Sequence, residues 1–285
     1  MRYQFLRFPG FKMKALTLSY DDGIQSDKRL AELLKSHGMK CTFNINTRTF
    51  GSNNNPNKLT PEEIKEFLID KGHEVAVHGD CHMAPGIAYP VGGIRDVLQC
   101  REKLESAFGM IIRGMAYPDS GITRMFNGNT KENIFAYLKD LGIVYSRTLA
   151  GDNNSFMLPE NFYAWMPTAH HNNPNLMNWT REFLDIKEEG YMTRKYPRLF
   201  YLWGHTYEFD NNDNWNLIEE FCDKVSGRDD IWYATNIEIY DYVTAYNSLV
   251  MSADGRMVYN PTLIEVFFMR DEKNYSVKPG ETLII

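Results

Sequence analysis

The sequence predicts a large α/β domain built as a parallel barrel. Strand-like and helix-like runs alternate along most of the chain and give seven or eight β-α repeats. A length of 285 residues fits one such domain with room for a small appendage. The polar residues that stand out follow strand-like runs, and active sites of parallel barrels lie at the carboxyl ends of the strands. These observations favour an enzyme.

The strand-like runs are short, apolar and separated by helical patterns. We expect strands at 14–20, 39–46, 73–78, 111–117, 143–147, 198–203 and 231–234. The runs between them have apolar residues at helical spacing, and several are followed by glycine. We expect helices at 26–37, 60–71, 93–108, 129–141, 176–189, 215–225 and 235–249. The helix that begins after Thr60 is the best marked, because Thr60, Pro61 and Glu63 supply an N-cap, a first-turn proline and a capping box.

The end of the chain has a different pattern. Residues 251–285 contain the turn signals Asp254-Gly255 and Pro279-Gly280 beside strand-like runs. We therefore expect a catalytic barrel over residues 1–250 and a short β-rich extension over 251–285 that packs on the barrel. No catalytic motif lies in this extension.

Composition and charge argue against several classes of protein. Hydrophobic residues make up 43% of the chain and charged residues 24%, which is ordinary for a globular protein. The net charge is −6 and no basic block stands out, so we expect no nucleic-acid partner. No apolar run reaches the ~18 residues of a membrane span. The chain as given is expected to be cytoplasmic, or periplasmic or secreted if a leader was removed, and its oligomeric state stays open.

Two acidic residues and two histidines form the most informative pattern. Asp21 and Asp22 close the first long strand-like run, and Gly23 lets the chain turn so that both carboxylates can serve one site. His78 and His82 are four residues apart, which suits both imidazoles to one metal ion. One carboxylate and two imidazoles leave positions open for water and substrate, as in a catalytic metal site.

The order of the motifs resembles the polysaccharide deacetylase family (NodB homology, carbohydrate esterase family 4) over roughly residues 14–245. Residues 19–23 (Ser-Tyr-Asp-Asp-Gly) resemble its first motif, and His78 with His82 resembles the second. Residues 116–118 (Ala-Tyr-Pro) fall in the third-motif region, and residues 202–205 (Leu-Trp-Gly-His) resemble the fifth. The resemblance implies an irregular (β/α)7 barrel of the polysaccharide deacetylase type.

The resemblance also implies roles for these residues. Asp22, His78 and His82 are the expected ligands of one divalent metal ion, and this nitrogen and oxygen set favours Zn²⁺ while also fitting Co²⁺, Ni²⁺ or Fe²⁺. Asp21 is the expected general base, which takes the proton of an attacking water whose pKa the metal lowers. His205 is the expected general acid, which protonates the leaving amine or alcohol.

The third motif departs from the family pattern. Residues 115–119 (Met-Ala-Tyr-Pro-Asp) stand where the family has Arg-Pro-Pro-Tyr, so the arginine that pairs with the base is missing. Arg113 lies earlier on the strand, but we expect Arg147, at the end of the next strand, to pair with Asp21. The family's fourth-motif aspartate, which orients the acid histidine, has no evident counterpart, although Glu208 and Asp210 follow His205 closely.

Loop residues are the expected substrate contacts. The backbone N–H of Tyr117 or Asp119 is the expected oxyanion donor, because the proline between them has none. Trp203 and Tyr207 flank the acid histidine and can contact a sugar. His170 or His171 can touch the substrate or a second metal, or lie exposed in a loop.

The predicted function is removal of acetyl groups from an acetylated carbohydrate. Amide cleavage is favoured, because N-deacetylation is the commonest reaction of the family that the chain resembles. The alternatives are an O-acetyl carbohydrate esterase, hydrolysis of a small non-sugar amide, and a glycan-binding barrel without turnover. A binding protein has no need for both Asp21 and His205, which argues against the last alternative.

Overall fold

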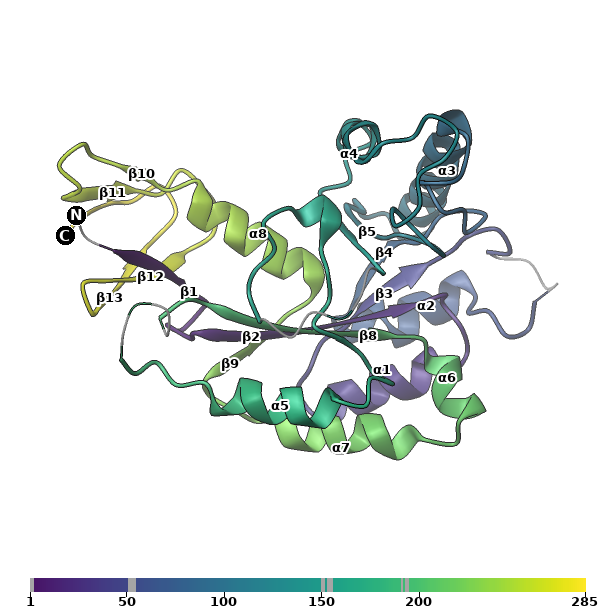
Figure 1. Ribbon diagram of the computed structural model, residues 1–285, viewed down its shortest axis with the longest axis horizontal. Coiled ribbons are helices and arrows are strands. Elements are labelled where there is room, and N and C mark those ends of the chain that lie inside the picture. Colours follow the sequence, from purple (N-terminus) through teal and green to yellow (C-terminus); the bar gives the residue numbers. More distant parts are fainter. Residues whose placement is uncertain (1–2, 51–54, 150–151, 153–155, 191, 193–194) are drawn as a thin grey trace.

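The computed structural model describes residues 3–50, 55–149, 152, 156–190, 192 and 195–285. Its central strands are Lys14–Asp21 (β2), Thr42–Ile45 (β3), Glu74–Val77 (β4), Gly114–Ala116 (β5), Tyr145–Arg147 (β6), Ala169–His170 (β7), Arg198–Gly204 (β8) and Ile231–Tyr233 (β9). Seven of them form one curled parallel sheet in the order β6-β5-β4-β3-β2-β8-β7, and β9 pairs with the start of β2 (Figure 1). The predicted parallel α/β architecture is confirmed.

Helices follow most of these strands. They are Asp27–Ser36 (α1), Pro61–Phe67 (α2), Pro90–Phe108 (α3), Lys131–Asp140 (α4), Leu176–Asp185 (α5), Thr206–Asn211 (α6), Trp215–Val225 (α7) and Asn236–Asn247 (α8), with 3-10 turns at Ile69–Lys71 (η1) and Phe162–Ala164 (η2). In Figure 1, α1, α5 and α7 lie below β2 and β8, while α3 and α4 lie near β4 and β5. The predicted capping box of α2 is present, because Thr60 and Glu63 bond each other's backbone N–H groups.

Strand β2 is the centre of the sheet. It pairs with β8 from Lys14 to Tyr20, with β3 near its carboxyl end, and with β9 near its start. All of its residues are buried, as expected for a parallel strand covered on both faces. Its last residue is Asp21, so this strand carries the predicted base into the centre of the carboxyl edge.

Strands β6 and β7 are the two ends of the curled sheet, and the described residues show no pairing between them. Trp165 pairs alongside β6: its N–H donates to the Ser146 carbonyl at 3.1 Å, and its carbonyl accepts from the Thr148 N–H at 2.9 Å. The Trp165 ring is buried and packs edge-on against Tyr145 and Tyr201. Trp165 therefore extends the sheet by one residue beside β6.

Two small antiparallel sheets stand beside α8. One contains Gln4–Arg7 (β1), Val266–Arg270 (β12) and Lys273–Val277 (β13), and the other contains Val250–Met251 (β10), Met257–Tyr259 (β11) and Thr282–Ile284 (β14). The expected β-rich segment is thus present, but β1 from the start of the chain joins it, which the sequence analysis did not foresee. The division into two domains stays a prediction.

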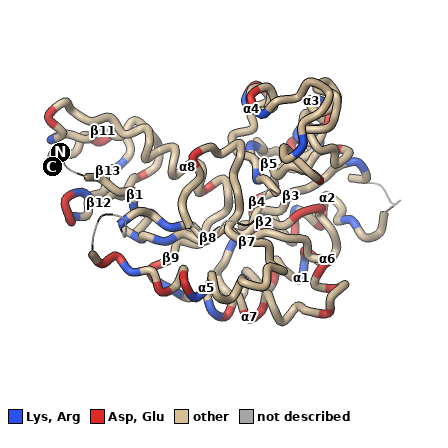
Figure 2. Tube along the Cα trace, in the orientation of Figure 1, with Lys and Arg blue, Asp and Glu red and all other residues tan. Residues whose placement is uncertain are grey.

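Charged residues of both signs are mixed along the chain, for example on α5 and α7 (Figure 2). Within the residues that the structure describes, no helix combines the length and apolar character needed to cross a bilayer.

Candidate active site

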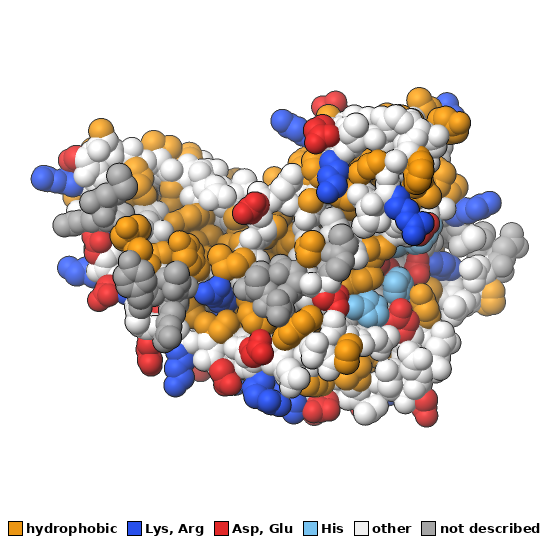
Figure 3. All heavy atoms as spheres, viewed as in Figure 1, with side chains coloured by type: hydrophobic (Ala, Val, Ile, Leu, Met, Phe, Trp, Pro, Cys, Tyr) orange, Lys and Arg blue, Asp and Glu red, His pale blue; other side chains and the backbone are white. Residues whose placement is uncertain are grey.

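The carboxyl ends of the strands bring most of the predicted residues to one pocket. Asp21 ends β2, Arg147 ends β6, and His205 follows β8 directly. The pocket has a volume of about 290 Å³ and is lined by Asp21, His78, His82, Tyr117, Asp119, Ser120, Leu149, Trp203 and His205. Figure 3 shows histidine side chains gathered beside acidic ones in a hollow of this face.

Asp21 is a buried carboxylate, 1% exposed, between two imidazoles. The Nε2 atoms of His78 and His205 each lie 3.8 Å from its Oδ2. Arg147 Nη2 donates to Oδ2, and Asn44 Nδ2 donates to Oδ1 at 2.8 Å. Burial raises the pKa of Asp21, but Arg147, the two imidazoles and the Asn44 hydrogen bond outweigh it and hold the pKa below its ordinary value. Asp21 is therefore ionised at neutral pH and able to accept a proton.

Arg147, and not Arg113, lies against this carboxylate. Its side chain is fully buried, and its guanidinium carbon lies 4.2 Å from the centre of the Trp203 ring. Arg113 instead donates two hydrogen bonds to Asp241, at 3.0 and 2.6 Å. Arg147 thus occupies the position that the sequence analysis expected for the partner of Asp21.

The predicted metal ligands also lie together. One ligand atom from each of Asp22, His78 and His82 lies within 4.8 Å of the other two. His78 Nδ1 donates to the Ala116 carbonyl at 2.9 Å, which leaves the lone pair on Nε2. Among the described residues, the buried Nε2 has no hydrogen-bond partner. Burial lowers the pKa of His78 to about 4. A neutral imidazole with its second nitrogen fixed by a carbonyl is the form that binds metal ions, so these residues fit a divalent ion.

The backbone is unusual at two of these ligands. Asp22 has a φ of 87° and His82 a φ of 57°, a conformation that residues other than glycine rarely adopt. Such conformations persist where the surroundings enforce them, and they concentrate at functional sites. For His82 the enforcing group is Asp96, which accepts from the N–H groups of Cys81 at 2.5 Å and Met83 at 3.1 Å.

Asp22 is positioned by two residues that the sequence analysis did not single out. Asn46 Nδ2 donates to Asp22 Oδ1 at 2.7 Å. Lys58 Nζ donates to the Asp22 carbonyl at 2.6 Å and lies 3.9 Å from Oδ1. These contacts fix both the backbone and the carboxylate, but nothing in the local sequence pattern marks either residue.

Glu208 is the partner of the predicted acid. Its Oε1 lies 3.3 Å from His205 Nδ1, because α6 begins directly after His205 and places the two residues on neighbouring positions of one turn. Burial lowers the pKa of His205, but Glu208, Asp21 and Asp22 outweigh burial and raise it above its ordinary value. Asp210, the other candidate, instead accepts from Trp215 Nε1 at 2.8 Å. Glu208 therefore stands where the family's fourth-motif aspartate was sought.

The prediction that His171 contacts substrate is wrong. His171 is fully buried, and its ring stacks on Phe209 and on Tyr20, with centroid distances of 4.2 and 5.7 Å. Its Nδ1 lies so close to Gly204 that a Cβ there would come within 2.0 Å of it. The ring therefore belongs to the core, and its Nε2 lies 2.8 Å from a carboxylate oxygen of Glu208.

His170 is part of the same polar cluster. Ligand atoms of His170, His205 and Glu208 lie within 4.8 Å of one another, which is close enough for a second metal ion. However, His170 Nδ1 accepts from the Asn172 N–H at 3.1 Å, which puts the proton of a neutral ring on Nε2, 3.2 Å from Glu208. This arrangement fits a proton donor to Glu208 and does not fit a ligand, so the second-metal prediction is not supported.

Of the two predicted oxyanion donors, only Asp119 fits. The Tyr117 N–H donates to the Arg147 carbonyl at 3.0 Å as part of the sheet, so the prediction for Tyr117 is wrong. Asp119 follows in a turn with a φ of 49°, and its N–H has no acceptor in the described part of the chain. Trp203 and Asp119 are among the residues that line the pocket. Tyr207, whose ring centre lies 5.1 Å from that of His205, stands beside the pocket and is 36% exposed.

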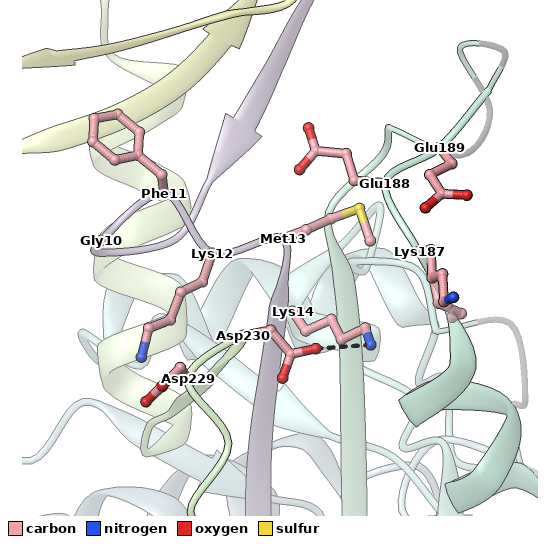
Figure 4. A pocket seen from close by; sticks show the side chains of 11 residues that line it. Gly10, Phe11, Lys12, Met13, Lys14, Lys187, Glu188, Glu189, Asp229 and Asp230 are labelled. Carbon is pink, nitrogen blue, oxygen red and sulfur yellow. Dashed lines mark hydrogen bonds and ion pairs between the residues drawn. The ribbon is translucent and has the colours of Figure 1, made fainter.

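A second hollow lies at the amino ends of the strands. It has a volume of about 330 Å³ and is lined by residues of both charge signs (Figure 4). Its buried lysine, Lys14, donates to the Leu184 carbonyl at 2.7 Å and to Asp230 at 3.1 Å. No histidine or cysteine is among the described residues that line it. The chemistry-bearing residues are thus gathered at the carboxyl ends.

Comparisons with known proteins agree with this placement. Residues 10–145 match the family described as polysaccharide deacetylase, and no curated protein sequence matches the chain. A putative polysaccharide deacetylase from Mycobacterium smegmatis has a TM-score of 0.56 at 18% identity, over 87% of this chain and 96% of that chain. A probable polysaccharide deacetylase from Pseudomonas aeruginosa PAO1 has a TM-score of 0.57 at 14% identity, over 82% of this chain and 92% of that chain. Puue allantoinase has a TM-score of 0.57 at 12% identity, over 82% of this chain and 91% of that chain.

At these identities the structural likenesses concern the fold. They confirm the predicted irregular (β/α)7 barrel of the deacetylase type. The chain spans 55% of the length of a Streptococcus pyogenes deacetylase PplD solved in complex with acetate, where the TM-score is 0.40 at 18% identity over 47% of this chain.

Proposed function

We propose, from the match of residues 10–145 to the polysaccharide deacetylase family, that the protein is a metal-dependent hydrolase that removes acetyl groups from a carbohydrate. One observation carries the proposal. Asp21 lies 3.8 Å from an imidazole on each side, one belonging to the candidate metal set and one paired with Glu208. This arrangement brings the proposed base, Asp21, close to both a candidate metal ligand and the proposed acid.

The metal set consists of Asp22, His78 and His82. A divalent ion bound there would polarise the acetyl carbonyl and lower the pKa of a water molecule. The buried Nε2 of His78, which lacks a hydrogen-bond partner among the described residues, supports this assignment. Lys58 and Asn46 hold Asp22 in place, and Asp96 holds the loop that carries His82.

The pKa values of the base and the acid are shifted in opposite directions. The lowered pKa of Asp21 keeps it ionised at neutral pH, so it can take a proton from the attacking water. The raised pKa of His205 favours its protonated form, which can give a proton to the leaving nitrogen or oxygen. The free N–H of Asp119 would donate to the carbonyl oxygen as negative charge develops there. Amide and ester hydrolysis use these same groups.

The test is acetate release from acetylated glycans, including chitooligosaccharides and acetylated xylan, by protein stripped with chelator and then restored with Zn²⁺, Co²⁺, Ni²⁺ or Fe²⁺. Asp21→Asn removes the base while the three ligands stay. We expect it to abolish release without loss of bound metal. Wild-type protein that holds metal but releases no acetate from any glycan would contradict the proposal and favour a small amide substrate or a binding role.

A further inference from the structure

We infer that Asp27 is a positioning residue, which holds the proposed acid His205 against the proposed base Asp21 by tying the turn after β2 to the start of α6. This inference rests on the proposed function and adds a residue to it. Asp27 is fully buried and is not among the residues that line the catalytic pocket. It therefore acts through the backbone segments that carry the base and the acid, and not on the substrate.

The Asp27 carboxyl group bonds to one residue from each of these two segments. Its Oδ2 accepts from the Ile24 N–H at 2.9 Å, and its Oδ1 accepts from the Thr206 hydroxyl at 2.6 Å. Ile24 stands two residues after Asp22 in the turn that follows β2. Thr206 is the first residue of α6 and directly follows His205. One buried side chain thus joins the turn that carries a candidate metal ligand to the segment that carries the acid.

The strands alone do not fix the acid against the base. Strands β2 and β8 pair in register only up to the residues just before Asp21 and His205. In the part of the chain that the structure describes, no backbone hydrogen bond joins residues 22–27 to residues 205–211, and the hydrogen bond that does join them is the one to Asp27. This bond therefore restrains the separation of 3.8 Å between His205 Nε2 and Asp21 Oδ2.

The carboxyl group of Asp27 lies in an environment that opposes its charge. Burial raises the pKa of Asp27 to about 7, although the hydrogen bonds from Thr206 and Ile24 lower it. Asp27 begins α1, and the first turn of a helix favours an acidic residue. An exposed acid would meet that preference without the cost of desolvation. The buried placement thus points to the tie, and not to the helix start, as the role of this side chain.

The tie does not depend on the protonation state of Asp27. The ionised form accepts a hydrogen bond on each oxygen. In the protonated form, its O–H can donate to the Thr206 oxygen while the other oxygen still accepts from the Ile24 N–H. The contact between the two segments is therefore present on both sides of neutral pH.

The tie matters because the two proton transfers act on atoms bonded to one carbon. Asp21 takes a proton from the water that attacks the carbonyl carbon, and His205 gives a proton to the nitrogen or oxygen that leaves it. A misplacement of about 1 Å can lower the rate of such a step about 100-fold. Binding of the substrate does not need this alignment. Loss of the tie should therefore lower kcat and leave KM unchanged.

Thr206→Val tests the inference, because it removes the hydroxyl group and keeps a branched side chain of similar size. We expect kcat for acetate release from N-acetylated chitooligosaccharides or acetylated xylan to fall about tenfold or more, with KM and bound metal unchanged. Thr206→Ser keeps the hydroxyl group and is expected to keep most of the wild-type kcat. Thr180→Val is the matched control, because Thr180 is also a fully buried threonine on a helix, and its hydroxyl donates to the Leu176 carbonyl at 2.8 Å away from the pocket. It should lose stability in urea but keep kcat.

A double-mutant cycle separates positioning from a simple loss of stability. Asp27→Ala should lower kcat by itself and add little in the Thr206→Val background, because either change breaks the same tie. The Thr206 pair decides the matter even where Asp27→Ala does not fold.

The inference is overturned if Thr206→Val keeps the wild-type kcat, if Thr206→Ser loses as much as Thr206→Val, or if the losses of the two single variants multiply. It is supported by a loss of kcat that Thr206→Ser and Thr180→Val do not reproduce. A wild-type protein that holds metal but releases no acetate would instead overturn the proposed function, and this inference with it.

Discussion

Replacing Arg147 with methionine removes the cation that neutralises the buried carboxylate of Asp21. Side chains of Arg147 and Asp21 are 0% and 1% exposed, and breaking such a pair by removing one partner costs about 3–5 kcal/mol. We expect the lower end of this range. Nε and Nη1 of Arg147 have no hydrogen-bond partner in the described chain, so their removal recovers part of the cost. Asn44 also keeps its hydrogen bond to Asp21.

The loss should depend on pH. In the wild type the pKa of Asp21 is lowered, so its ionised form stabilises the fold above the unfolded pKa of about 3.9, and this contribution is lost as pH falls through the folded pKa. Without Arg147, burial dominates and raises the pKa. In the variant, the contribution of the Asp21 carboxyl to stability is therefore present below its unfolded pKa and is lost as pH rises through its folded pKa. The difference in the free energy of unfolding between the wild type and Arg147→Met should be largest near pH 7 and shrink toward pH 4.

Urea unfolding at both pH values, followed by tryptophan fluorescence, measures these differences. Arg7→Met is the matched control, because Arg7 is also fully buried and pairs with a carboxylate, Glu188, that is 34% exposed and lies outside the catalytic pocket. It should lose stability but keep acetate release, whereas Arg147→Met should lose both. A loss below about 1 kcal/mol at pH 7, or the same loss at both pH values, would refute the reasoning.

Two further predictions concern the metal set and the acid. His78→Ala should reduce bound metal, measured by elemental analysis after dialysis, because it removes the buried nitrogen that lacks a partner in the described chain; full metal retention would contradict the ligand assignment. Glu208→Gln should lower the rate of acetate release and move the alkaline limb of the pH–rate profile to lower pH, because Glu208 raises the pKa of His205. Asp210→Asn is the control, and an unmoved limb in Glu208→Gln would argue that Glu208 does not hold the acid.

The sequence predicted the barrel and the convergence of Asp21, Asp22, His78, His82 and His205, because these residues stand at strand ends. In a parallel sheet the carboxyl ends meet at one edge, so position along the chain translates into position in space. Arg147 could be preferred to Arg113 as the partner of Asp21 because Arg147 also stands at the carboxyl end of a strand.

The errors arose where the outcome depends on neighbours in space. The Tyr117 N–H is consumed by the Arg147 carbonyl, and only the register between β5 and β6 reveals it. His170 and His171 are adjacent at the end of a strand, so their side chains point to opposite faces, and one of them had to enter the core. Glu208 could not be assigned because helix α6 was not predicted, and that helix turns Glu208 back to His205.

The pairing of Asp21 with Arg147 also has a consequence for synthesis of the chain. The two residues are 126 positions apart, and ribosomes add about 5–20 residues per second. For roughly 6–25 s a nascent chain therefore holds the first residue without the second, and the acid histidine is made later still. A truncated product that ends before β6 contains most of the recognisable motifs but neither a neutralised base nor an acid. The proposed hydrolysis therefore requires a chain that extends at least beyond His205.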